Sequence, residues 1–261
     1  MHATPPENNL FRIMKTLLSG LCLFGFVPVT SAQDVFGSGE HQFTMDFVDV
    51  GNPGNAADAD PFLSGAVDYE FRMGTYEVSQ RMIDAYNALS GKPAIYMWPD
   101  RGPNKPATFV SWNSAAKFVN WLNTSKGYAP AYKFSTDEPT SATNIELWTS
   151  ADAGYDPANP YRNANAHYVL PSMSEWHKAA FYDPSANGGA GGYWDYATGS
   201  NSAPTSVSSG TSAGTAVYNH ISSHGPAEVD NAGGLSPYGT MAQNGNVWEW
   251  IEDNSSYGSR D

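Results

Sequence analysis

The stretch SPYGTMAQNGNVWEWIED, residues 236–253, combines side chains that are otherwise spread along this chain. Its centre, residues 245–250, places two tryptophans and the carboxylate of Glu249 beside adjoining Asn-Gly and Gly-Asn pairs. This composition predicts a tight turn that leads into a buried aromatic strand. With carbonyls facing inward, the turn offers calcium the hard oxygen ligands it prefers, together with Glu249 and the amide of Asn246. The alternative, which composition alone favours, is a solvent-facing turn that caps an aromatic core.

The amino-terminal end has the pattern of an export signal. Arg12 and Lys15 precede an apolar run at residues 17–29, and small side chains follow up to Ala32. We therefore predict a secretory signal peptide over residues 1–32, with Met14 as a candidate start. The apolar run is too short for a membrane span. Residues 33–261 are expected to form one domain, secreted or periplasmic, without a span of their own.

Composition excludes several classes of function. The formal charge is −13, from 13 Lys and Arg against 26 Asp and Glu, so nucleic acid is not an expected partner. The acidity is compatible with cation binding but is explained more simply by solubility. The single cysteine, Cys22, lies in the predicted signal. The exported domain is therefore expected to contain no disulfide, thiolate metal site or cysteine nucleophile.

Alternating apolar residues predict strands over residues 41–50 and 67–73, and the short run Tyr-Val-Leu before Pro171 predicts a third strand at residues 168–170. Helix caps are predicted at Ser79 and at Ser111 or Asn113, between the second and third strands, and at Ser172, just after the third. Apolar positions three and four residues apart follow the first two caps: Met82, Tyr86 and Leu89, then Ala115, Phe118, Val119 and Leu122.

The third of these helices begins with a Ser-x-x-Glu capping box at residues 172–175. Its Glu175 and His177 could act as a catalytic acid and base. The simpler interpretation, which we prefer, is that Glu175 caps the helix and His177 lies on its surface.

The order of four motifs resembles one known family. FRMGTYEVSQ, PATFVSWNSAAKFVNWLN, YVLPSMSEWHKAAFYDP and SPYGTMAQNGNVWEW follow one another in residues 71–250. They resemble the sulfatase-modifying factor family, also called the formylglycine-generating enzyme family, and in particular a bacterial exported subgroup. The resemblance covers roughly residues 42–253. It implies an α+β, C-type lectin-like fold in which short helices and small twisted sheets are joined by long loops around calcium.

The resemblance also implies metal ligands. The calcium site of the family corresponds to main-chain carbonyls at Gly245 and Val247 and to the carboxylate of Glu249. A further ligand position is occupied by Ala242 here, so this site is expected to be weaker or completed by water. A second family calcium site corresponds to Asn219, although its later ligands find no match in residues 222–229.

The chain departs from the family pattern at its carboxyl end. Family members continue past GNVWEW, and their oxidases carry two copper-binding cysteines in that region. This sequence ends at Asp261 without them, so we expect an incomplete fold, no copper and no catalytic residue.

Three functions remain open. They are an exported calcium-stabilised module that binds or scaffolds, an oxidase whose cysteine-bearing part is missing here, and a secreted binder of a protein or glycan through exposed aromatic side chains.

Overall fold

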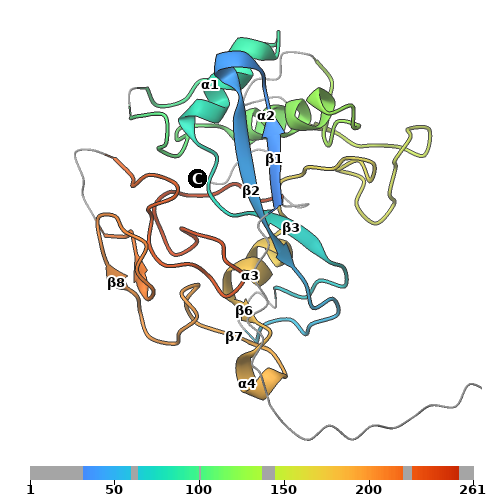
Figure 1. Ribbon diagram of the computed structural model, residues 1–261. Coiled ribbons are helices and arrows are strands. Elements are labelled where there is room, and N and C mark those ends of the chain that lie inside the picture. The colour runs from blue at the N-terminus through green and yellow to red at the C-terminus, as the bar shows by residue number, and fades with distance from the viewer. Residues whose placement is uncertain (1–31, 60–63, 100, 137–144, 220–224, 253–261) are drawn as a thin grey trace, which may run out of the picture.

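The computed structural model describes residues 32–59, 64–99, 101–136, 145–219 and 225–252. Short helices and small sheets alternate along the chain and are joined by long loops (Figure 1), which confirms the predicted α+β class. The predicted signal peptide lies outside the described residues except for Ala32. The elements are β1 (Ala32–Phe36), a 3-10 turn η1 (Gly39–His41), β2 (Phe43–Val50), β3 (Phe71–Gly74), α1 (Gln80–Leu89), α2 (Trp112–Ser125), β4 (Lys133–Phe134), β5 (Ile145–Glu146), α3 (Met173–Phe181), β6 (Tyr182–Asp183), α4 (Ala186–Gly189), β7 (Gly192–Tyr193), β8 (Thr205–Ser206) and β9 (Thr215–Ala216).

A three-stranded antiparallel sheet in the order β1-β2-β3 runs through the molecule. The strand predicted over residues 41–50 is confirmed from Phe43 onward. The strand predicted over residues 67–73 is shortened to β3, because the carbonyl of Val67 accepts the N–H of Gly54 at 2.9 Å and so bonds to the preceding loop. At the carboxyl end of β3, the pairing with β2 extends one residue beyond Gly74. There the N–H of Thr75 donates to the carbonyl of Asp46 at 2.8 Å.

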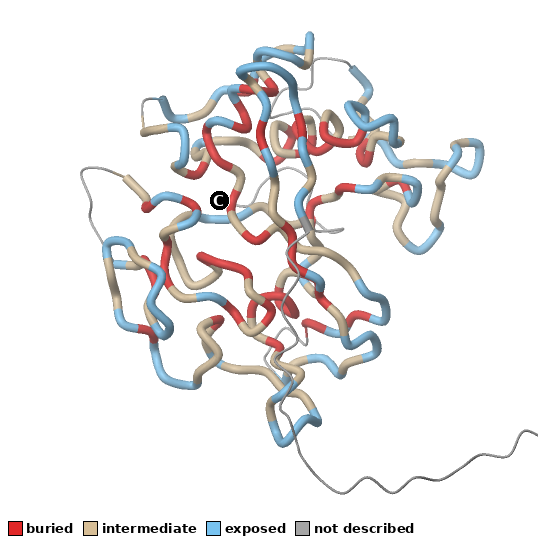
Figure 2. The backbone as a smooth tube through the Cα atoms, in the orientation of Figure 1, coloured by how far each residue is buried: buried red, intermediate tan, exposed pale blue. Residues whose placement is uncertain are grey.

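All three predicted helices form where their caps indicated. The α1 helix follows Ser79, and α2 follows Ser111, whose side chain accepts the N–H of Ser114. The α3 helix follows Ser172 with both hydrogen bonds of the capping box present. Buried side chains of α1 and α2 form one hydrophobic core with Phe36, Phe43 and Phe47 of the sheet. Figure 2 shows buried segments of the chain where the two helices lie against the sheet.

Residues 168–170 do not form the predicted strand. Their backbone groups are instead bound by side chains of neighbouring elements. Asn123 of α2 accepts the N–H of Tyr168 and donates to its carbonyl, at 2.9 and 2.7 Å. The N–H of Leu170 donates to the hydroxyl of Tyr132 at 2.9 Å. Side chains of Asn123 and Tyr132 therefore hold this segment in place of a partner strand.

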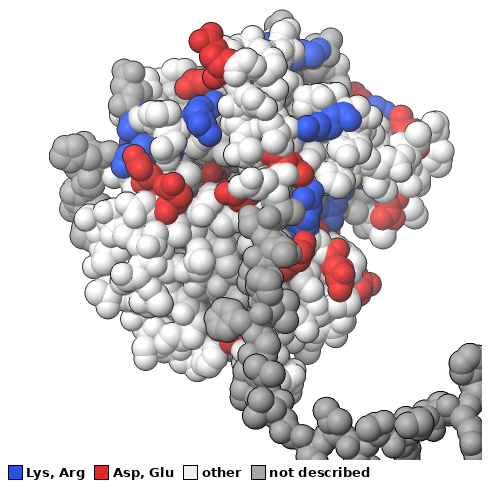
Figure 3. Space-filling model, in the orientation of Figure 1, with Lys and Arg blue, Asp and Glu red and all other residues white. Residues whose placement is uncertain are grey.

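The part of the chain after α3 is held mainly by turns and short pairings. Between residues 184 and 217 the sequence carries a single charged side chain, Asp195, and Figure 3 shows a wide uncharged surface over this part of the molecule. A small second core joins Val50 of β2 to Ala179, Tyr182 and Tyr238. Among the described residues, no helix is both long and apolar enough to cross a membrane.

Candidate functional site

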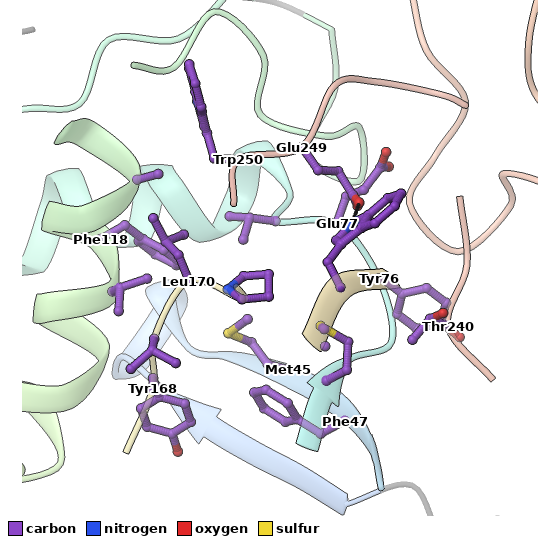
Figure 4. A pocket seen from close by; sticks show the side chains of 18 of the residues that line it. Met45, Phe47, Tyr76, Glu77, Phe118, Tyr168, Leu170, Thr240, Glu249 and Trp250 are labelled. Carbon is purple, nitrogen blue, oxygen red and sulfur yellow. Dashed lines mark hydrogen bonds between the residues drawn. The ribbon is translucent and has the colours of Figure 1, made fainter. Parts of the chain in front are cut away.

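A cavity of about 440 Å³ lies between the central sheet, α2 and the turn at residues 242–250 (Figure 4). Met45 and Phe47 of β2 line one wall, and Phe118 of α2 lines another. Most of the lining is apolar, but two carboxylates, Glu77 and Glu249, lie side by side at one end (Figure 4). A concave apolar site with a few polar groups is the usual form of a binding pocket.

The carboxylate of Glu77 is enclosed by protein. Glu77 lies shortly after β3 in the chain, and the residue is only 8% exposed. The Oε2 atom accepts the side-chain N–H of Asn246 at 2.6 Å, whereas Oε1 is buried and has no hydrogen-bond partner among the described residues. Burial and the nearby charge of Glu249 raise the pKa of Glu77 to about 8, although bonds from Asn246 and Val247 act in the opposite direction.

Glu249 faces the cavity. Protein surrounds its carboxylate on most sides and raises its pKa, while the indole N–H of Trp176 donates to Oε2 at 2.5 Å and lowers it. The residue is nevertheless exposed, because its side chain lines the cavity. Two carboxylates placed so close together cannot both be ionised without cost, so this end of the cavity favours a cation.

The turn that carries Glu249 is fixed by contacts from the preceding segment. The N–H of Asn246 donates to the carbonyl of Val217 at 2.7 Å, and its side-chain oxygen accepts the N–H of Ala227 at 2.8 Å. Gly245 packs so tightly that an added Cβ would lie 2.1 Å from the carbonyl oxygen of Val217. This position therefore requires glycine. Together, Gly245 and Asn246 hold the turn against the preceding segment.

The turn is present as predicted, but the prediction of a buried strand after it is wrong. Trp248 is 96% exposed, and residues 247–251 form no strand. The indole N–H of Trp250 instead donates to the carbonyl of Val110 at 2.7 Å. The N–H of Glu252 donates to the carbonyl of Pro171 at 2.6 Å, which leaves only an isolated bridge to Ser172.

Three of the four predicted calcium ligands lie together in the structure, and the fourth, Asn219, belongs to a separate site. Gly245, Val247 and Glu249 lie in one turn, and the carbonyls of Gly245 and Val247 accept no hydrogen bond from the described residues. Asn219 is exposed, and residues 220–224, which hold part of its site, lie outside the described residues. Ala242 is buried with φ of 75°, a conformation that asparagine tolerates better than alanine.

The sequence patterns above do not single out Glu77, which lies two residues before the helix cap at Ser79. An acidic residue inside an otherwise apolar entry segment was the available signal. Within the described residues, no three His, Cys, Asp or Glu side chains converge as metal ligands. A metal at this turn would therefore depend on main-chain oxygens as well as carboxylates.

Glu175 and His177 have structural partners. Glu175 completes the helix cap and pairs with Arg162 at 3.3 Å, and the hydroxyl of Tyr69 donates to it at 2.7 Å. His177 Nε2 lies 2.9 Å from a carboxylate oxygen of Asp58. The structure supports the interpretation of Glu175 as the helix cap. The predicted surface position of His177 is wrong, because its ring is buried against Asp58.

Comparison with known proteins supports the family resemblance. The family model described as "Sulfatase-modifying factor enzyme 1-like domain" matches residues 43–259. Among solved structures, the chain is similar to Treponema denticola variable protein 1, with 20% identity, a TM-score of 0.48, and coverage of 85% of this chain and 77% of that one. No curated protein matches. The match over most of the sequence shows that this chain belongs to the sulfatase-modifying factor enzyme 1-like domain family.

Proposed function

We propose that this chain is an exported, calcium-stabilised binding module with a C-type lectin-like arrangement, and that it does not oxidise a substrate in this form. The observation that carries the proposal is the turn at residues 242–250, which presents oxygen atoms beside an apolar cavity. A ligand held in that cavity would contact Glu249 and the exposed indole of Trp248.

The donor set at the turn fits calcium. Glu249 provides a carboxylate, and Gly245 and Val247 provide carbonyl oxygens that no described residue occupies. Hard oxygen donors of these two kinds are those that calcium binds. When bound, the ion would offset the repulsion between Glu249 and Glu77 and cross-link the turn. Its role in this proposal is to hold the wall of the cavity in place.

The sequence supports a function without oxidation. Copper chemistry of the family type needs two thiolates, and soft thiolate ligands select Cu(I). The one cysteine of this chain, Cys22, falls in the predicted signal peptide. We therefore propose that the domain binds a protein or glycan and that copper is not its cofactor.

Calcium is expected to raise the melting temperature of the exported domain. At a free concentration a hundredfold above Kd, a ligand specific for the native state adds about 2.7 kcal/mol, which corresponds to roughly 5 to 10 °C for a domain of this size. Glu249→Gln should reduce this rise because it weakens the only carboxylate ligand. Ala242→Asn should enlarge it by supplying an oxygen at the position that lacks one. The measurement is differential scanning calorimetry in EDTA and in calcium.

The matched control for this test is Glu146→Gln, which removes an exposed carboxylate of β5 that does not line the cavity. This variant should respond to calcium like the parent. Identical melting curves of the parent protein in EDTA and in calcium would reject the calcium site.

Export is expected to release a domain that begins at Gln33. Cleavage after Ala32 would remove the first residue of β1 but keep the remaining pairs of Gln33–Phe36 with β2. Intact mass spectrometry of the protein from culture medium or periplasm checks this prediction. Full-length chain recovered only from the cytoplasm would contradict it.

A further inference from the structure

We propose that the cavity binds an extended apolar peptide segment that adds a strand to β3 and places an arginine against Glu249. This proposal rests on the binding function proposed above and names the class of partner. Because calcium and the arginine would both be bound by Glu249, the peptide is expected to bind the calcium-free domain. Three features support it: a free strand edge, an apolar lining, and opposite charges at the two ends of the cavity.

The first feature is the outer edge of β3. Because the N–H of Thr75 bonds to the carbonyl of Asp46, the alternation of an antiparallel ladder directs the backbone groups of Met73 toward β2. The N–H and C=O groups of Arg72 and Gly74 then point away from β2. Neither residue has a backbone partner on that side among the described residues, and both line the cavity. An extended peptide is the ligand that satisfies such an edge.

The second feature is the lining beside this edge. Met45 and Phe47 of β2, with Met241 from the facing turn, offer a soft apolar surface. A Cβ added at Gly74 would meet no atom closer than 3.5 Å, so space is open over the face of the strand at this position. Trp248 is almost fully exposed at the same cavity. Apolar side chains at alternate positions of a bound strand would cover these groups.

The third feature is the distribution of charge. Beyond Gly74 the chain leads directly to Glu77, which lies beside Glu249. At the opposite end, Arg72 pairs with Asp34 at 2.8 Å and lies 3.0 Å from a ring nitrogen of His167. A cationic side chain is therefore attracted to one end of the cavity only.

This asymmetry also places the arginine within an antiparallel peptide. A strand antiparallel to β3 has its amino-terminal end beside Glu77, so the arginine belongs at that end. Its guanidinium can donate two hydrogen bonds to one carboxylate, which makes the contact geometrically specific.

The test uses the peptide acetyl-Arg-Thr-Val-Thr-Val-Thr-Val-amide with fluorescein at its carboxyl end, and a control peptide with citrulline in place of arginine. Binding to the whole exported domain is measured by fluorescence anisotropy in EDTA. We expect saturable binding of the arginine peptide and about tenfold weaker binding of the citrulline peptide, because a charged hydrogen bond is lost. Glu249→Gln should weaken binding of the arginine peptide by a similar factor, and Glu146→Gln should leave this binding unchanged.

Hydrogen exchange on the parent protein gives a readout that does not depend on the folding of any variant. The amides of Arg72 and Gly74 should become protected when the arginine peptide binds. Equal affinity for both peptides, binding without this protection, or absence of saturable binding would overturn the proposal. Occupation of the edge by a second copy of the chain, detected as a dimer that blocks the peptide, would also overturn it.

The outcomes separate this inference from the calcium proposal. A calcium-dependent rise in melting temperature without peptide binding rejects only the peptide proposal. Peptide binding in EDTA without any calcium effect rejects only the calcium site.

Discussion

Replacing Arg162 with methionine is expected to lower the free energy of unfolding by about 3 to 5 kcal/mol at pH 7, the usual effect of removing one partner from a buried charge network. Arg162 Nη2 lies 3.3 Å from Glu175, and its Nε lies 3.7 Å from Glu252. Both carboxylates are buried. Without the guanidinium they would face each other across the interior with no counter-charge.

The loss in the Arg162→Met variant should depend on pH. In the parent, Arg162 and hydrogen bonds hold the pKa of Glu175 below its ordinary value of 4.5 despite the opposing effect of burial. That stabilisation is present above the ordinary pKa and is lost only as the pH falls through the folded value. In the variant, burial would raise the pKa of Glu175, and it would raise further the pKa of Glu252, which burial already raises in the parent despite Arg162. Protonation should therefore recover stability between pH 7 and pH 5. The difference between parent and variant should shrink over this interval.

Urea unfolding followed by tryptophan fluorescence at pH 7 and pH 5 measures both effects. Arg81→Met is the matched control, since Arg81 is exposed on α1, and it should change stability by no more than about 0.5 kcal/mol. A loss of similar size in the two variants would show that the network contributes nothing beyond ordinary surface charge.

Replacing Asn123 with leucine is expected to cost at least about 3 kcal/mol, because three backbone groups, two of them buried, lose their partner. Asn123 is 0% exposed. Its side-chain oxygen accepts the N–H groups of His167 and Tyr168 at 2.8 and 2.9 Å, and its amide donates to the carbonyl of Tyr168 at 2.7 Å. Leucine has a similar volume but offers none of these bonds.

The measurement combines urea unfolding with hydrogen exchange at His167 and Tyr168, whose amides should exchange faster in the variant. Thr124→Ala on the same helix is the control, because the Thr124 hydroxyl is exposed and bonds only to carbonyls of its own helix. Unchanged exchange at residues 167 and 168 would mean that Asn123 does not hold this segment.

The two predictions concern the same structural feature. Arg162 and Asn123 each join segments that do not pair as strands, and both lie near walls of the cavity formed by residues 167–171 and 175–176. Loss of either side chain is therefore expected to loosen the proposed binding site as well as the fold.

Sequence by itself determined the elements that depend on neighbours within one turn. The cap residues Ser79, Ser111 and Ser172 marked the starts of α1, α2 and α3. The side chains of Ser111 and Ser172 each accept the backbone N–H three residues further on, whereas the side chain of Ser79 forms no cap hydrogen bond. The motif order also determined the family, which the match over residues 43–259 confirms.

Tertiary structure alone decided which distant groups meet. Alternation could not show that Asn123 replaces a partner strand for residues 168–170, or that Trp248 is exposed while Trp250 is partly buried. Glu77 gave no sign that it would lie beside Glu249. The physical reason is that these contacts join loops through individual side chains, whose hydrogen bonds have no period in the sequence, whereas a helix repeats the same local bond at every turn.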